Sequence, residues 1–166
     1  MRLPVAGIPV RGRLVMLSPA LDWAVEAVRV ALEAPPSRLS GELLVMPPVK
    51  FGRVDVRAAV QTSAPRCCDR CGEDLELAVD TEVTLSFVPP DGEPADRGEV
   101  QVDEDLDFGI YEDGALDLGQ VVLDAVGLAV PSRVACTNEV ACEARTAALL
   151  GETRPAGPFA ALRGPQ

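Results

Sequence analysis

The chain has 166 residues, of which 48% are hydrophobic, and a formal net charge of −11. It contains no histidine, which excludes Ser-His-Asp and Cys-His catalysis. Its one lysine, Lys50, follows Val49, so the Gly-Lys-Ser/Thr of a phosphate-binding P-loop is missing too. Without GxSxG, GxGxxG or HExxH motifs, the sequence predicts a protein that is not an enzyme.

The N-terminal apolar run is interrupted by proline, glycine and arginine, unlike the about 7–15 continuous apolar residues of a secretory signal. No stretch approaches the ~20 apolar residues of a membrane span. We therefore expect a cytoplasmic protein with no membrane partner, in which the five cysteines are thiols rather than disulfides.

The negative charge is concentrated in one part of the chain. Residues 1–70 carry a net charge of +4, residues 71–117 carry −15, and residues 118–166 are balanced. A field of this sign disfavours tight binding to naked RNA and favours a basic protein partner.

The first predicted element is a helix that begins near Ser18 as cap, with Pro19 at its first position, and ends before Pro35. Its apolar stripe is predicted to face the core and consists of Leu21, Val25, Val28 and Leu32.

Three β-like runs are predicted next as strands, at residues 39–46, 53–63 and 75–88, and apolar and polar residues alternate in the second and third. The run Cys68-Asp69-Arg70-Cys71-Gly72 lies between the second and third strands, so we expect it at the tip of a β-hairpin. One face of the hairpin should pack against the first helix.

Residues 89–105 are rich in proline, glycine and acid and are expected to form a mobile loop. Asp117, followed by Gln120 three residues later, resembles a capping box and predicts a second helix that ends before Pro131. Its predicted apolar stripe consists of Leu118, Val121, Val122, Ala125 and Val126. A short helix at residues 139–150 and a loosely ordered tail from about residue 151 complete the chain. The predicted fold is a single α+β domain over residues 1–166, with an antiparallel sheet packed against two helices.

The cysteines suggest a metal site. A Cys-x-x-Cys-Gly turn brings two thiolates together, and a second pair lies downstream, so the predicted ligands of one structural zinc ion are Cys68, Cys71, Cys136 and Cys142. Cys67 is left over. Two alternatives stay open, namely buried thiols without a metal and a redox Cys-x-x-Cys pair.

The acidic run does not fit a calcium loop. On an EF-hand register, Phe108 stands where glycine is needed and Gly114 where a bidentate glutamate is needed. We expect a partner-binding surface instead, formed by Asp103, Glu104, Asp105 and Asp107.

Three runs carry a family resemblance over about residues 39–166: RCCDRCGEDLELAVDTEVTLSFVP, DEDLDFGIYEDGALDLGQVVLDAVGLAVP and RPAGPFAALRG. They resemble the YceD-like family of large ribosomal RNA subunit accumulation proteins. The resemblance implies a small α+β ribosome-biogenesis factor that supports accumulation or processing of large-subunit (23S) rRNA and has no known catalytic activity. The resemblance also implies that Cys68 and Cys71 are the family's Cys-x-Arg-Cys pair. It implies that the central helix opens at Asp117 and Leu118 and closes at Leu128, Ala129 and Pro131. The implied C-terminal signature consists of Pro158, Phe159 and Leu162.

The chain departs from the family pattern at two places: Gly72 replaces the usual leucine, and the C-terminal cysteine cluster is reduced to Cys136 and Cys142. The sequence leaves two modes of action open. In the first, which we expect, the protein binds a ribosomal protein or processing factor through its acidic surface. In the second, Arg66 and Arg70 beside the cysteine turn contact rRNA directly.

Overall fold

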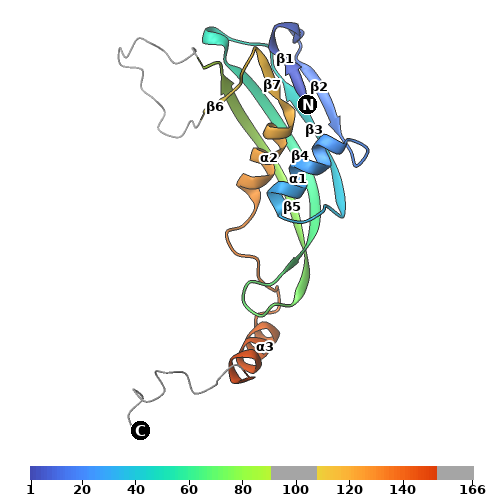
Figure 1. The fold of residues 1–166 in the computed structure, drawn as a ribbon, viewed down its shortest axis with the longest axis vertical. Helices are drawn as coiled ribbons and strands as arrows, with labels where there is room; N and C mark the ends of the chain where they lie inside the picture. The colour runs from blue at the N-terminus through green and yellow to red at the C-terminus, as the bar shows by residue number, and fades with distance from the viewer. Residues whose placement is uncertain (91–107, 153–166) are drawn as a thin grey trace, which may run out of the picture. The chain divides into compact units, whose positions relative to one another are not determined.

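The computed structural model describes residues 1–90 and 108–152 (Figure 1). The chain separates into two compact units, Met1–Pro65 with Glu76–Pro131, and Arg66–Leu75 with Ser132–Gln166. The single domain predicted over residues 1–166 stays a prediction, and most of the expected loop at 89–105 and of the tail lies outside the described residues.

The first unit is built on a five-stranded sheet in the order β2-β3-β4-β5-β6. The strands are β2 (Arg13–Leu17), β3 (Arg38–Val45), β4 (Val54–Cys67), β5 (Asp74–Val88) and β6 (Phe108–Ile110). β3, β4 and β5 confirm the three predicted strands, and only six residues separate the paired strands β4 and β5, as in a hairpin. β2 and the parallel pairing of β6 with β5 were not predicted, so the sheet is mixed rather than wholly antiparallel.

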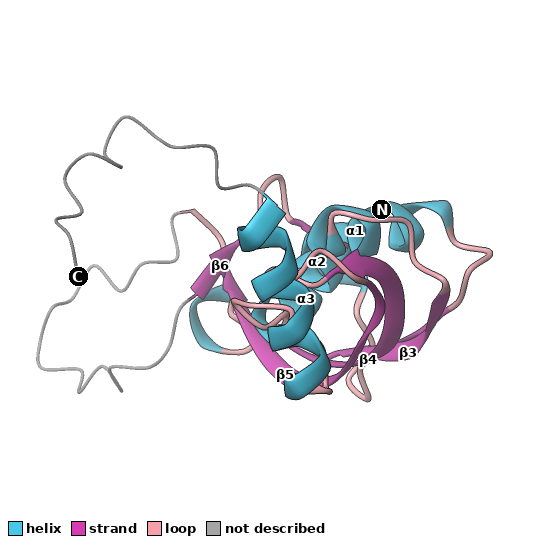
Figure 2. Cartoon of the chain, turned by 90° about the horizontal axis from the view of Figure 1, so that it is seen from below, coloured by secondary structure: helices cyan, strands magenta, loops and turns pink. Residues whose placement is uncertain are grey.

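One face of this sheet forms the core. Along β4, Val54, Val56, Ala58 and Val60 are fully buried while the residues between them are more exposed. This face is covered by α1 (Asp22–Leu32) and α2 (Leu118–Ala129), which pack against each other (Figures 1 and 2). The arrangement confirms the predicted α+β class.

The start of α1 differs from the prediction. Leu21 occupies the cap position, and no side chain caps the helix, so the predicted Ser18 cap is wrong. The Leu21 N–H donates to the Ser18 carbonyl at 3.1 Å, which makes Ser18–Leu21 a turn in front of the helix. Pro19 takes the second position of this turn, where its fixed φ is equally favourable. The buried face of α1 consists of Ala24, Ala27, Val28 and Leu32.

The predicted cap of α2 is confirmed, because Asp117 Oδ1 accepts a hydrogen bond of 2.9 Å from the Gly119 N–H. Gln120 does not complete a capping box, since its amide donates to Asp124 at 2.7 Å instead. The buried stripe of α2 agrees with the predicted one and consists of Leu118, Val121, Val122, Ala125 and Val126.

Two short strands anchor the N-terminus. β1 (Arg2–Pro4) pairs antiparallel with β7 (Ala115–Asp117), which places Leu3 opposite Leu116. Both leucines are buried. Short 3-10 turns at Val5–Gly7 and Lys50–Gly52 link strands that are consecutive in the sequence, β1 with β2 and β3 with β4.

The helix of the second unit is α3 (Glu139–Glu152), which confirms the helix predicted at residues 139–150. None of the helices within residues 1–90 and 108–152 has the length and apolar character needed to cross a membrane.

Candidate metal centre

The Cys-x-x-Cys turn is a compact loop between β4 and β5. The Cys68 N–H donates to the Glu73 carbonyl at 2.8 Å, and the Gly72 N–H donates back to the Cys68 carbonyl at 2.9 Å. Gly72 has a φ of +71°, a left-handed conformation that glycine adopts without a steric penalty. Gly72 therefore closes the turn that directs both thiols inward.

The second cysteine pair is oriented by the start of α3. The Asn138 side chain accepts a hydrogen bond of 3.0 Å from the Ala141 N–H, and the Cys142 N–H donates to the Asn138 carbonyl at 3.0 Å. Asparagine is a favoured residue at this capping position. The first helical turn thus fixes the direction of the Cys142 side chain.

Asp69 joins the two halves of the site. Its N–H donates to the Val134 carbonyl at 2.8 Å, and its carboxylate accepts from the Val134 N–H at 2.7 Å. Val134 is buried and lies two residues before Cys136. This pair of hydrogen bonds holds the Cys136 segment against the turn.

All four predicted cysteines come together. The sulfur atoms of Cys68, Cys71, Cys136 and Cys142 lie within 4.8 Å of one another. The Cys71–Cys136 distance is 3.5 Å and the Cys68–Cys142 distance is 3.7 Å. Zn–S bonds of ~2.3 Å in a tetrahedron place the sulfurs ~3.8 Å apart, whereas a disulfide bond is only ~2.05 Å long. The cluster therefore has the dimensions of a four-thiolate metal site.

The cluster is largely closed to solvent. Cys68, Cys71 and Cys142 are 2%, 6% and 2% exposed, Cys136 is half-buried, and Leu75 packs against them. Four protein ligands would complete the coordination sphere, so no position would remain for a reactive water. The arrangement suits a structural ion, and tetrahedral sulfur coordination fits zinc or an iron–sulfur centre.

The surroundings divide the four thiols into two kinds. Several hydrogen bonds lower the pKa of Cys68 to about 6, and the one from the Arg70 backbone N–H has the largest effect. A hydrogen bond from the Arg145 side chain lowers the pKa of Cys71. Burial raises the pKa of the other two thiols, that of Cys142 to about 12. Each close sulfur pair thus joins a thiol of lowered pKa to one of raised pKa. A divalent cation would replace the remaining protons and relieve the repulsion among four thiolates.

Arg145 is a residue that the sequence argument missed. One of its terminal nitrogens donates to the Cys136 sulfur at 3.3 Å, and its Nε lies 3.5 Å from the Glu73 carboxylate in an ion pair without hydrogen-bond geometry. Arg145 follows Cys142 by three residues, a spacing that places two side chains on the same face of a helix. This spacing was the signal available in the sequence.

The remaining predicted site residues lie elsewhere. Cys67 is exposed, and its sulfur donates to Asp74 at 3.4 Å, so it is outside the cluster. Arg66 is half-buried, and Arg70 is exposed and forms an ion pair of 3.2 Å with Glu143. Outside the described residues lie the four predicted partner-binding residues and the three C-terminal residues of the resemblance: Asp103, Glu104, Asp105, Asp107, Pro158, Phe159 and Leu162.

Comparison with curated proteins gives no match, and comparison with solved structures gives none either. The family model described as large ribosomal RNA subunit accumulation protein YceD matches residues 56–163, about two-thirds of the chain. The match begins on β4, later than the expected residue 39, and it includes the hairpin, α2 and all four clustered cysteines. The chain therefore belongs to the YceD family of large ribosomal RNA subunit accumulation proteins.

Proposed function

We propose that this protein is a non-enzymatic, cytoplasmic ribosome-biogenesis factor that supports accumulation or processing of large-subunit (23S) rRNA. The family match over residues 56–163 is the observation that carries the proposal. The four-cysteine cluster is consistent with it, because a closed thiolate site offers a structural element and no open coordination position.

In this proposal the cluster holds one structural zinc ion. The support comes from the sulfur-only donor set, the spacing of the sulfurs and their burial. Elemental analysis of protein purified without chelator tests the assignment. About one zinc per chain is expected, and less than ~0.2 zinc per chain, or iron in its place, would reject it.

The protein acts, we propose, through a protein partner rather than by holding RNA. Residues 91–117 contain eleven acidic residues and one basic residue, a density of charge that attracts a basic ribosomal protein or processing factor. Asp103, Glu104, Asp105 and Asp107 are the proposed contact residues. Their support is the charge pattern of the sequence alone.

Direct rRNA contact through Arg66 and Arg70 is less well supported. The Arg70 guanidinium already pairs with Glu143 at 3.2 Å. The described residues of the second unit comprise four basic and six acidic side chains, a net charge of −2. Such a surface releases few counterions from a phosphate backbone, so its contribution to RNA affinity should be small.

The proposal is tested in cells that lack the protein, by ribosomal-subunit profiles and by the amount of intact large-subunit rRNA. A reduced large-subunit peak that the intact gene restores is expected. A normal peak and normal rRNA in those cells, including after cold stress, would contradict the proposal.

The partner mode has its own test, in which Asp103, Glu104, Asp105 and Asp107 are changed together to their amides. The matched control neutralises four exposed carboxylates elsewhere, at Asp22, Glu76, Glu82 and Glu139. Loss of a ribosomal partner from pull-downs with the first variant alone is expected. Equal recovery with both variants would contradict the acidic contact, and steeply salt-dependent binding to a 23S rRNA fragment would favour direct contact instead.

A further inference from the structure

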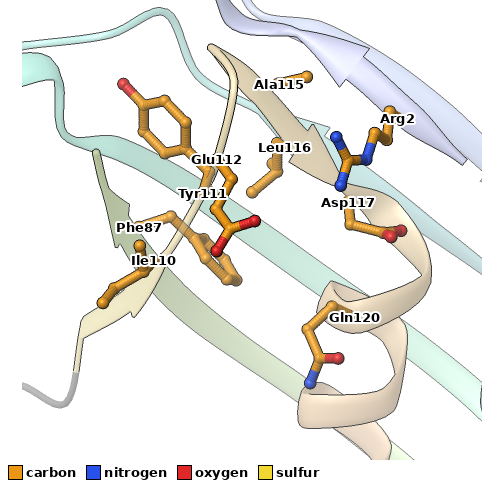
Figure 3. Close-up of a pocket in the computed structure, with 9 residues that line it drawn as sticks. All are labelled: Arg2, Phe87, Ile110, Tyr111, Glu112, Ala115, Leu116, Asp117 and Gln120. Atoms are coloured by element: carbon orange, nitrogen blue, oxygen red, sulfur yellow. The ribbon is translucent and has the colours of Figure 1, made fainter. Parts of the chain in front are cut away.

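A pocket of about 160 Å³ opens on the first unit, between β6, β7 and the first turn of α2 (Figure 3). None of the four clustered cysteines lines it. Its volume suits a single side chain rather than a larger ligand.

The floor of the pocket is apolar and held in place. Phe87 and Leu116 are 3% and 1% exposed, and both line the pocket. Gly109 pairs with Phe87 across the parallel strands, and a Cβ atom at Gly109 would lie 2.5 Å from the Phe87 ring. The glycine therefore provides the space that the aromatic ring occupies.

The mouth of the pocket is polar and negative. Glu112 and Gln120 both line the pocket, and Figure 3 shows Glu112 between β6 and β7 and the Gln120 amide on the first turn of α2. Ile110, on β6, is 65% exposed beside them. The pocket therefore combines an apolar wall with a carboxylate at its opening.

Glu112 differs from the other charged groups around the pocket. Arg2 pairs with Asp113 at 3.1 Å, and the N-terminal amine pairs with Asp117 at 3.4 Å. Among the described residues, the Glu112 carboxylate has no ion-pair partner. The sequence from 108 to 131 contains four acidic side chains and no basic one, so this charge is not compensated along the chain.

We propose that the pocket receives an arginine or lysine side chain from a basic segment of a protein partner. The aliphatic stem would pack against Phe87 and Ile110, and the cationic head would reach Glu112. The inference rests on the proposed function, because it gives a docking point to the protein partner proposed there. It uses only described residues, and the acidic sequence 91–107 leads directly into β6, so the local charge favours the same kind of partner.

Two other occupants fit less well. An apolar side chain would fill the floor but cover the Glu112 carboxylate without pairing it, which is costly. A nucleic acid would bring phosphates toward a surface of the same sign. The combination of aromatic floor and single unpaired carboxylate favours a cationic side chain.

The test uses the full chain with its metal and the peptide acetyl-Gly-Ala-Arg-Ala-Gly-amide, followed by NMR. Two further peptides replace the arginine by citrulline, its neutral analogue of similar shape, and by leucine. The arginine peptide should shift the amide signals of Ile110, Glu112 and Gln120 and bind more tightly than either analogue. Equal binding of all three peptides, or shifts confined to other residues, would overturn the proposal.

Two variants sharpen this result. Glu112→Gln removes the charge at the pocket, whereas Glu82→Gln removes one exposed charge from β5 away from the lining. Glu112→Gln should weaken arginine-peptide binding about two- to fivefold, and Glu82→Gln should not change it. Equal affinities for the two variants would contradict a specific contact with Glu112.

Failure of this inference is distinguishable from failure of the proposed function. If cells lacking the protein lose large-subunit rRNA but the arginine peptide does not bind at the pocket, the inference is wrong and the function stands. If the peptide binds at the pocket but those cells keep normal rRNA, the pocket stands as a cation-binding site and the function is wrong.

Discussion

Asp69 and Val134 are linked by two hydrogen bonds, one of 2.8 Å from the Asp69 N–H to the Val134 carbonyl and one of 2.7 Å from the Val134 N–H to the Asp69 carboxylate. The residues lie 65 positions apart in the sequence. Asp69 belongs to the Cys-x-x-Cys turn, and Val134 precedes Cys136. One side chain thus aligns the two halves of the candidate metal centre without contributing a ligand.

Asp69→Ala should therefore weaken zinc binding, because the Cys136 segment loses the bond that positions it. Removal of an outer-shell partner typically reduces metal affinity about 10- to 100-fold. Competition with a chromophoric chelator measures the change. Asp69→Asn keeps an oxygen acceptor for the Val134 N–H and should retain most of the affinity. An Asp69→Ala protein that binds zinc as tightly as the unchanged chain would show that the site is aligned without this bond.

Cys67 and Cys136 provide a second comparison. The sulfur of Cys136 lies 3.5 Å from that of Cys71 within the cluster. Cys67, which is next to Cys68 in the sequence, is exposed and donates to Asp74 instead. Cys136→Ser should lower zinc affinity by more than the about 10- to 100-fold expected for an outer-shell change, because a ligand itself is lost. Cys67→Ser should leave both the affinity and one zinc per chain unchanged. If Cys67→Ser releases the metal, the ligand set proposed here is wrong.

The sequence predicts those parts of the fold whose signal is local. The alternation along β4 and β5 and the stripe of α2 depend only on residues within each element, and all three are found. The four clustered cysteines could be grouped because a Cys-x-x-Cys-Gly turn has a known geometry. Their mutual distances depend on Asp69 and Val134, which no local pattern connects.

The missed elements depend on distant pairing. β1 has three residues and forms because Leu3 meets Leu116 on β7, more than a hundred residues later. β6 is equally short, and its register is set by Phe87 lying against Gly109. The start of α1 was misplaced because Ser18-Pro19 favours a turn as strongly as it favours a helix start. In each case, contacts between residues distant in the sequence decide whether the strand forms or where the helix begins.

Tyr111 allows a prediction about pH, because it is the only tyrosine in the chain. Burial raises its pKa above the usual value of 10.0, and its hydroxyl donates to the Gly52 carbonyl at 2.8 Å. The neutral form is thus favoured in the folded state. Its stabilising contribution is complete below pH ~10 and is lost as the pH rises further. Ultraviolet titration of tyrosinate should give a higher midpoint for the folded chain than for the urea-unfolded chain. Identical midpoints would contradict the burial of this hydroxyl.

Gly41 should be intolerant of substitution. It pairs with Leu17 on one side and Val60 on the other, in the middle of the sheet, and its φ is +149°. A Cβ atom there would overlap the Ala59 carbonyl oxygen and lie 3.0 Å from the Val60 Cα. Both neighbours are backbone atoms of a paired strand and cannot move alone. Gly41→Ala should therefore lower the free energy of unfolding by about 2–4 kcal/mol, measured by urea denaturation.

Gly127 is the matched control for Gly41→Ala, because it lies in α2, is exposed, and a Cβ atom there would meet no atom within 4 Å. Alanine restricts the unfolded chain and has the higher helix propensity, so Gly127→Ala should raise the free energy of unfolding by about 0.5–1 kcal/mol. The two substitutions add the same methyl group and should shift the urea midpoint in opposite directions. A stable Gly41→Ala protein would mean that β3 and β4 separate at this position without loss of the sheet, which the close packing of their backbones argues against.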